Sequence, residues 1–182
     1  MSKAIGMVEY KTVSTGMLVA DAMLKTAQVE IIEAQTVCPG KYIFIITGDL
    51  SGVNASIELA RTTYSNHLID SFILGNPHES IFPAMYGATH IERIDALGIL
   101  ETFSAASIFV AADEAAKTAV VDLIELRIAR GMCGKSYLLL TGELSAVEAS
   151  IEKAKKAVGD GAMLLDYTII PNPDSKFLKS IL

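Results

Sequence analysis

The segment Ala4-Ile5-Gly6-Met7-Val8-Glu9 opens this chain of 182 residues, and Ala96-Leu97-Gly98-Ile99-Leu100-Glu101 repeats its pattern at an offset of 92, since residue 96 matches residue 4. Each copy is a short apolar run that ends in glutamate, which is typical of a buried strand. The same offset continues downstream, where Asp21, Lys25, Thr26 and Ala27 return as Asp113, Lys117, Thr118 and Ala119. The chain is therefore a tandem duplication.

Each half of the chain predicts the same series of elements after its opening strand. A helix comes first, which Ser14 or Thr15 can cap, with an expected apolar face at Ala20, Met23, Leu24 and Ala27. Two strand-like runs, 29–36 and 42–47 in the first half, then enclose a turn.

A second helix follows this hairpin in each half. We expect it to be capped at Ser51 in the first half and by a Ser145–Glu148 capping box in the second. Its apolar faces are expected at Val53, Ile57 and Ala60, and at Val147, Ile151 and Ala154. A strand at 68–74 or 164–170 and a short helix opened by Asn-Pro close each half.

This order predicts an α+β protein made of two tandem ferredoxin-like domains, each a small antiparallel sheet with helices on one side. We expect the first domain at residues 1–86, a linker at 87–95 and the second domain at 96–182.

The turn of the first hairpin carries one of the two cysteines, in the stretch Val37-Cys38-Pro39-Gly40-Lys41. Pro39 suits the second position of a type II turn, and Gly40 tolerates the positive φ that such a turn needs next. We expect Cys38 to be presented outward. A bystander cysteine in a hairpin loop is the alternative, because a single cysteine carries little signal.

The equivalent loop of the second half carries the other cysteine. Gly134-Lys135 matches Gly40-Lys41 at an offset of 94, so the second loop, which reads Arg130-Gly131-Met132-Cys133-Gly134, is two residues longer. Its length and its two glycines raise the entropic cost of holding Cys133 in one geometry. We therefore expect Cys133 to be a spare thiol rather than a metal ligand.

The composition narrows the class of protein. Apolar residues make up 51% of the chain, yet no run reaches the ~18 residues of a membrane span, so we expect apolar surface to be buried between subunits. The net charge is −6 and the sequence has no run of basic residues, so it gives no indication of a surface that binds nucleic acid. Met1-Ser2-Lys3-Ala4 has no signal-peptide layout, so a cytosolic location is expected, in which cysteines are thiols or metal ligands.

The sequence carries none of the better-known catalytic motifs. It lacks a glycine-rich phosphate loop, a nucleophile elbow and an HExxH motif, so we do not expect an enzyme. His67, His78 and His90 are scattered and are expected at the surface or at interfaces.

Nearly the whole chain resembles bacterial microcompartment shell proteins of the tandem, trimer-forming kind. The resemblance rests on the repeated opening strand, the helix segment 21–25, the Gly-Asp and Gly-Glu strand exits and the closing Ile-Pro-Asn-Pro at 170–173. It implies that three chains form a pseudohexameric tile, in contact with other shell proteins, in a shell in the cytoplasm. It also implies that Lys25 and Lys117 lie at the tile edge, and that a central pore is lined by Val37, Cys38, Pro39, Gly40, Arg130, Gly131, Met132, Cys133 and Gly134.

Within this family, the Cys-Pro-Gly-Lys sequence at 38–41 is similar to the first-domain pore loop of the iron-sulfur shell proteins of propanediol-utilisation compartments. That resemblance implies one 4Fe-4S cluster per homotrimer, bound by three copies of Cys38, and electron transfer across the shell with an encapsulated or cytosolic redox enzyme. The chemistry agrees, because such clusters usually take four thiolates: one Cys38 cannot hold one, whereas a threefold axis supplies three.

Two other functions stay open at this stage. The chain can be a shell tile with a metabolite pore and no cluster, in which Arg130 either favours anions or pairs with a nearby carboxylate. It can also be a soluble trimeric electron-carrier or signalling protein built from ferredoxin-like domains.

Overall fold

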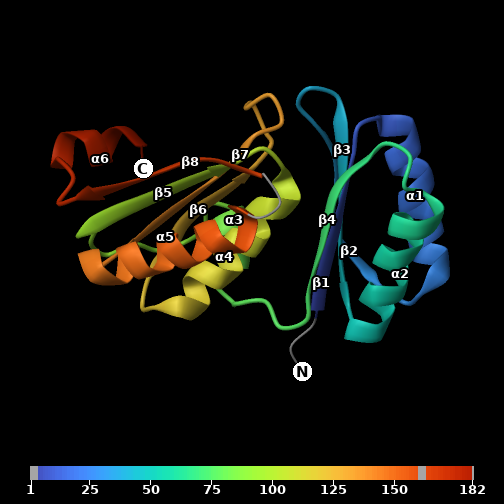
Figure 1. Ribbon diagram of the computed structural model, residues 1–182, viewed down its shortest axis with the longest axis horizontal. Coiled ribbons are helices and arrows are strands. Elements are labelled where there is room, and N and C mark those ends of the chain that lie inside the picture. Colours follow the sequence, from blue (N-terminus) through green and yellow to red (C-terminus); the bar gives the residue numbers. More distant parts are fainter. Residues whose placement is uncertain (1–3, 160–162, 182) are drawn as a thin grey trace. The chain divides into compact units, whose positions relative to one another are not determined.

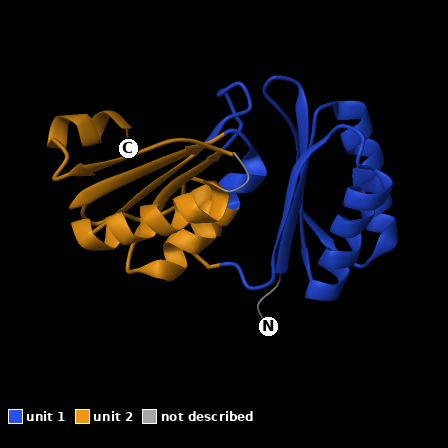
Figure 2. Ribbon diagram, viewed as in Figure 1, with its two compact units in different colours: residues 1–77, 103–109, 128–136 blue, residues 78–102, 110–127, 137–182 orange. Residues whose placement is uncertain are grey.

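The computed structural model describes residues 4–159 and 163–181, which fall into two compact units (Figure 2). Unit 1 comprises residues 1–77, 103–109 and 128–136, and unit 2 comprises residues 78–102, 110–127 and 137–182. The unit boundaries thus differ from the sequence repeat, because two short segments of the second half belong with the first sheet. The expected domain ends at residues 1 and 182 lie outside the described residues, and the domain division of the sequence stays a prediction.

The first half forms a four-stranded antiparallel sheet in the order β2-β3-β1-β4. Helices α1 and α2 cover one face of it (Figure 1). The register between the two central strands pairs Ala4 with Gly48 and Tyr10 with Tyr42. The elements are β1 (Ala4–Tyr10), α1 (Val13–Thr26), β2 (Glu30–Val37), β3 (Lys41–Gly48), α2 (Leu50–Thr63) and β4 (Leu68–Leu74).

The second half repeats this topology, with a four-stranded sheet in the order β6-β7-β5-β8. Both halves therefore have the predicted α+β fold, which is confirmed. A short helix, α3 (Ile81–Met85), precedes this half. Its elements are β5 (Ala96–Thr102), α4 (Ala105–Thr118), β6 (Asp122–Ile128), β7 (Ser136–Gly142), α5 (Leu144–Gly159), β8 (Leu164–Pro171) and α6 (Ser175–Ile181). None of the helices in the described part of the chain has the length and apolar character needed to cross a membrane.

The repeated glycine of the opening strand sets how closely a helix approaches each sheet. A Cβ atom at Gly6 would lie 2.7 Å from the Val53 side chain and 2.8 Å from that of Ile57. In the second half, a Cβ atom at Gly98 would lie 2.9 Å from the Val147 side chain. The apolar faces expected for α2 and α5 are confirmed, since Val53, Ile57, Ala60, Val147, Ile151 and Ala154 are all buried.

The helix caps expected from the sequence are wrong. Helix α1 begins at Val13, so its N-cap is Thr12, and α2 begins at Leu50 after Asp49. Helix α5 begins at Leu144, which places Ser145 inside its first turn rather than at a cap. Each of these helices begins within three residues of the end of the preceding strand, earlier than the expected caps allow.

The buried face of α1 also differs from the expected one. Ala20 and Met23 are buried as predicted, but Leu24 is 38% exposed, and Gly16 and Val19 complete the face instead. The buried face of α1 therefore lies closer to the start of the helix than predicted. Several other large apolar side chains remain exposed, including Met17, Leu18, Ile31, Leu50, Phe103 and Val120.

Candidate metal centre

Cys38 lies at the tip of the hairpin between β2 and β3, where its thiol is free and exposed. The Gly40 amide donates a 2.9 Å hydrogen bond to the Val37 carbonyl, which closes the turn over Cys38 and Pro39. This hydrogen bond makes Val37 the first residue of the turn and Pro39 the third, and the Cys38–Pro39 peptide bond is cis. The prediction that Pro39 takes the second position is therefore wrong. Gly40 has the expected positive φ, at 103°.

The turn is open at Gly40 and anchored at its base. A Cβ atom at Gly40 would meet no atom within 4 Å, whereas Val37 at the base of the turn is buried and pairs with Lys41. The turn therefore has an anchored base and a free tip. This arrangement presents the Cys38 thiol outward on a short, hydrogen-bonded loop.

Cys133 lies in a second tight turn, between β6 and β7, and its thiol is also exposed. The Lys135 amide donates a 3.1 Å hydrogen bond to the Met132 carbonyl across Cys133 and Gly134. Both central residues have positive φ, 53° for Cys133 and 89° for Gly134, as in a type I′ turn. Cys133 thus holds a left-handed conformation that a residue with a Cβ atom rarely adopts.

The two cysteine turns lie against each other within unit 1. A Cβ atom at Gly134 would be 3.2 Å from the Cys38 carbonyl oxygen and 2.8 Å from Nζ of Lys41. Only glycine fits this close approach at this φ. The structure thus brings together the two loops that the sequence analysis assigned to the pore.

The remaining loop residues have defined surroundings. Arg130 forms an ion pair with Glu33 of β2. Of the two roles considered for this arginine, the structure shows pairing with a carboxylate. The buried Ser136 hydroxyl accepts a 3.1 Å hydrogen bond from the Ala129 amide and fixes the start of the loop. Gly131 has a φ of 71° and stands in open space.

A 4Fe-4S cluster fits these residues only if several chains share it. Among the described residues, no three His, Cys, Asp or Glu side chains are grouped closely enough to hold a metal ion. One chain offers Cys38 and Cys133 alone, while such a cluster usually takes four thiolates. The exposed position of Cys38 leaves its thiol accessible to other copies of the chain.

The two lysines expected at the tile edge have different surroundings. Lys25 contacts Asp21 at 2.6 Å, and both side chains are exposed. Lys117 contacts Asp113 at the same distance, but the Asp113 side chain is only 4% exposed and also accepts a 2.8 Å hydrogen bond from the His78 amide. Lys25 is therefore a surface charge, whereas Lys117 is the counter-ion of a buried carboxylate.

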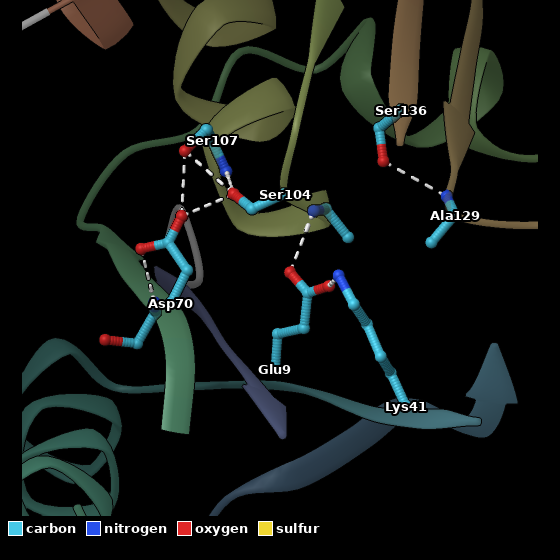
Figure 3. Close-up of polar contacts among 9 residues, drawn as sticks. Glu9, Lys41, Asp70, Ser104, Ser107, Ala129 and Ser136 are labelled. Carbon is cyan, nitrogen blue, oxygen red and sulfur yellow. Dashed lines mark hydrogen bonds and ion pairs between the residues drawn. The ribbon is translucent and has the colours of Figure 1, made fainter. Parts of the chain in front are cut away.

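A cluster of polar contacts next to the Cys38 hairpin was not found from the sequence (Figure 3). Glu9 of β1 contacts Nζ of Lys41 at 2.8 Å and accepts a 2.9 Å hydrogen bond from the Ala105 amide at the start of α4. Asp70 of β4 accepts hydrogen bonds from the Ser104 and Ser107 hydroxyls, the latter at 2.8 Å. All of these residues belong to unit 1.

The two carboxylates hold the first turn of α4 on the first sheet. Ser104 caps this helix, since its hydroxyl accepts a 3.0 Å hydrogen bond from the Ser107 amide. Negative charge is favourable at a helix N-terminus, which adds to the direct hydrogen bonds. Burial raises the pKa of Glu9 above its ordinary value of 4.5, although the Lys41 ammonium and the Ala105 amide oppose that rise.

The one signal for this cluster in the sequence is the repeat itself. Glu9 recurs as Glu101, and Asp70 occupies the same place in its strand as Asp166. A repeated charge in an otherwise apolar strand is informative, because a buried carboxylate needs a partner.

Comparison with known proteins identifies the family. The model of the BMC domain matches the chain twice, at residues 4–77 and 96–173. The bacterial microcompartment shell protein PduT of Citrobacter freundii is 36% identical over 173 residues, which cover 95% of this chain and 94% of that protein. A carboxysome shell protein of Synechocystis is 32% identical over 85 residues, or 44% of this chain and 82% of that protein.

Solved structures agree with this assignment. The crystal structure of a microcompartment protein from Desulfitobacterium hafniense is 44% identical, with a TM-score of 0.85 over 98% of this chain and 99% of that one. A fused, permuted hexameric shell protein has the same fold, with a TM-score of 0.68 at 20% identity over 87% of this chain and 84% of that one.

The family determines the general role. BMC-domain proteins form microcompartment or carboxysome shells in the bacterial cytoplasm, and they are structural proteins rather than enzymes. The location and the non-enzymatic role expected from the sequence are thus confirmed. The chain belongs to the BMC-domain family and is a tandem-domain microcompartment shell protein similar to PduT.

Proposed function

We propose that this shell protein is a homotrimeric tile in which three copies of Cys38 bind one 4Fe-4S cluster on the threefold axis, for electron transfer across the shell. A redox enzyme, encapsulated or cytosolic, is the proposed exchange partner. The hairpin loops at 37–40 and 130–134 line the axis in this proposal, and Lys25 and Lys117 lie toward neighbouring tiles.

The observation that carries the proposal is the position of Cys38. Its thiol is exposed at the tip of a turn that a hydrogen bond from Gly40 to Val37 closes, and the base of the turn is anchored in the sheet. Identical copies of such a turn present their sulfur atoms in the same geometry, which a shared cluster requires. A long mobile loop would lose more entropy on ligation.

The chain supplies the binding groups, and the cluster supplies one-electron chemistry when bound. Three thiolates leave one iron site for a non-protein ligand. Ionic contacts on the same loops, between Lys41 and Glu9 and between Arg130 and Glu33, place fixed charges beside the cysteine turns. Such charges influence the reduction potential of an iron-sulfur centre.

The cysteine of the second loop has a different role in this proposal. Cys133 is already constrained in a left-handed conformation by its own turn. We assign it no ligand role, and its thiol stays a free group near the axis.

Anaerobic purification tests the proposal. The expected product is a brown trimer that contains about four iron and four sulfide ions per three chains. Sedimentation should show a stable trimer at micromolar concentration. A colourless, iron-free trimer would refute the cluster and favour a tile with a metabolite pore, and a stable monomer would refute the trimer itself.

A further inference from the structure

The two cysteines of the chain lie on turns that contact each other within unit 1. A Cβ atom at Gly134, the residue after Cys133, would lie 3.2 Å from the Cys38 carbonyl oxygen. Bond lengths then place the Cα atoms of Gly134 and Cys38 within about 7 Å of each other. The Cα atom of Cys133 is one peptide unit, about 3.8 Å, from that of Gly134. The two thiols therefore lie on neighbouring loops, although they are far apart in the sequence.

Both loops combine a fixed base with a tip that can adjust. Val37 is buried at the base of the first loop, and the buried Ser136 hydroxyl holds the second through its 3.1 Å hydrogen bond from the Ala129 amide. A Cβ atom at Gly40 or at Gly131 would meet no atom within 4 Å, so each loop contains a glycine in open space. Glycine changes its backbone dihedral angles at little steric cost. The bases thus keep the loops side by side while the tips can move.

This arrangement brings a disulfide within reach of the two thiols. A disulfide needs Cα atoms about 4.4–6.8 Å apart, so the loop tips have to approach by roughly 4 Å or less. Both thiols are exposed, so this movement disturbs little packing. The chain contains two cysteines in all, and Cys38–Cys133 is therefore the one intrachain disulfide that it can form.

A neighbouring thiol decides what happens to an exposed cysteine under oxidation. A hydroperoxide converts a thiol to a sulfenic acid, which a second thiol nearby converts to a disulfide. Without such a partner, further oxidation gives a sulfinic acid, which thiol reductants do not reverse. Cys38 has a potential partner of this kind in its own chain.

We propose that Cys133 is the resolving thiol of Cys38, so that the two form an intrachain disulfide when Cys38 is free of iron and meets a hydroperoxide. The disulfide itself goes beyond the proposed function. It rests on that function for one consequence, namely that the oxidised chain cannot bind the cluster until a dithiol reduces it. When the cluster is bound, Cys38 is occupied and Cys133 is a free thiol.

The reaction balances with hydrogen peroxide as the oxidant. The Cys38 thiolate attacks one peroxide oxygen, the O–O bond breaks, and the departing hydroxide takes up the proton that the thiol released. The Cys133 thiolate then attacks the sulfur of the Cys38 sulfenic acid, the S–O bond breaks and a second water leaves. Two thiols thus lose two protons and two electrons, and one peroxide becomes two water molecules.

Intact-mass spectrometry after thiol alkylation tests the pair on the full chain. The chain is freed of iron with a chelator under argon, treated with equimolar hydrogen peroxide and alkylated with N-ethylmaleimide. The expected product is a single chain on a non-reducing gel that has lost two hydrogen atoms and takes up no N-ethylmaleimide. Its tryptic digest should contain peptides 26–41 and 131–135 joined by a disulfide. Dithiothreitol should restore both thiols and, with them, the uptake of iron and sulfide.

Two variants are the matched controls. Cys133→Ser removes the resolving thiol, so the same treatment should leave part of Cys38 as sulfinic acid, which dithiothreitol does not restore. Lys25→Cys/Cys133→Ser keeps two exposed cysteines, but the 8 residues of β2, a strand roughly 26 Å long, separate them. This double variant should form no intrachain disulfide. Circular dichroism should show a native fold for both.

The outcomes separate this inference from the proposed function, because the disulfide is measured on the iron-free chain. Unmodified chains that keep two alkylatable thiols, or that become cross-linked to one another, would overturn the pairing whether or not a cluster exists. Full recovery of the Cys38 thiol in Cys133→Ser would overturn the resolving role. Protein that is free of iron after anaerobic purification, yet still forms the intrachain disulfide, would refute the cluster alone.

Discussion

Substitution of Cys133 should change stability according to how well the new residue tolerates a left-handed backbone. Cys133 has a φ of 53°, and the hydrogen bond between Lys135 and Met132 holds it there. For a residue with a Cβ atom, this conformation costs about 1 kcal/mol. The thiol is exposed, so its removal loses little packing.

The magnitude follows from this cost. Cys133→Asn should raise the free energy of unfolding by about 0.5–1 kcal/mol, because asparagine adopts the left-handed region readily. Cys133→Gly should give a smaller gain of about 0.5 kcal/mol, since glycine also raises the entropy of the unfolded chain. Cys133→Val should lower stability by about 1 kcal/mol or more, because a branched Cβ fits this region poorly.

Urea unfolding at one fixed protein concentration measures this series, since the stability of an oligomer depends on concentration. Cys133→Ala is the matched control: it removes the thiol, keeps the Cβ atom and should remain within about 0.5 kcal/mol of the unmodified chain. A series in which valine is as stable as asparagine would refute the assigned turn.

Three further changes test other parts of the structure. Lys41→Met leaves the buried Glu9 without its counter-ion and should lower the free energy of unfolding by about 3 kcal/mol at pH 7. Burial raises the pKa of Glu9 in the folded chain, so stability falls as pH rises through that pKa. Urea unfolding should therefore show a smaller difference between Lys41→Met and the unmodified chain near pH 5 than at pH 7. Gly98→Ala should cost about 1–3 kcal/mol in urea unfolding through overlap with α5, whereas Gly75→Ala, with only ordinary contacts, should not. Lys25→Asp should leave trimers intact in sedimentation but abolish ordered sheets in electron microscopy; loss of the trimer would show that this lysine is not at a tile edge.

The repeat and the strands could be predicted from the sequence because each strand is a compact apolar run with clear ends. The strand at 68–74 has the predicted bounds. Both ends of β2 and both ends of β3 differ from the predicted bounds by one residue. Because the chain is duplicated, the same strand pattern occurs in both halves and supports each strand assignment twice.

Helix starts and the polar cluster could not be predicted in the same way. Ser145 has an acceptable capping pattern, but the end of the preceding strand decides where α5 begins. Glu9 and Ala105 are separated by 96 residues along the chain, so only the folded structure brings them together. The close approach of Gly134 to the Cys38 turn is likewise a contact between distant parts of the chain, which no local motif reports.

The iron content of two matched variants tests the central claim most directly. Cys38→Ser and Cys133→Ser each replace one exposed thiol by a hydroxyl, so both should fold and form trimers like the unmodified chain. After anaerobic purification, Cys38→Ser should have lost its iron and sulfide, while Cys133→Ser should retain most of both. Iron that persists in Cys38→Ser, or that disappears in Cys133→Ser alone, would contradict the assignment of Cys38 as the cluster ligand.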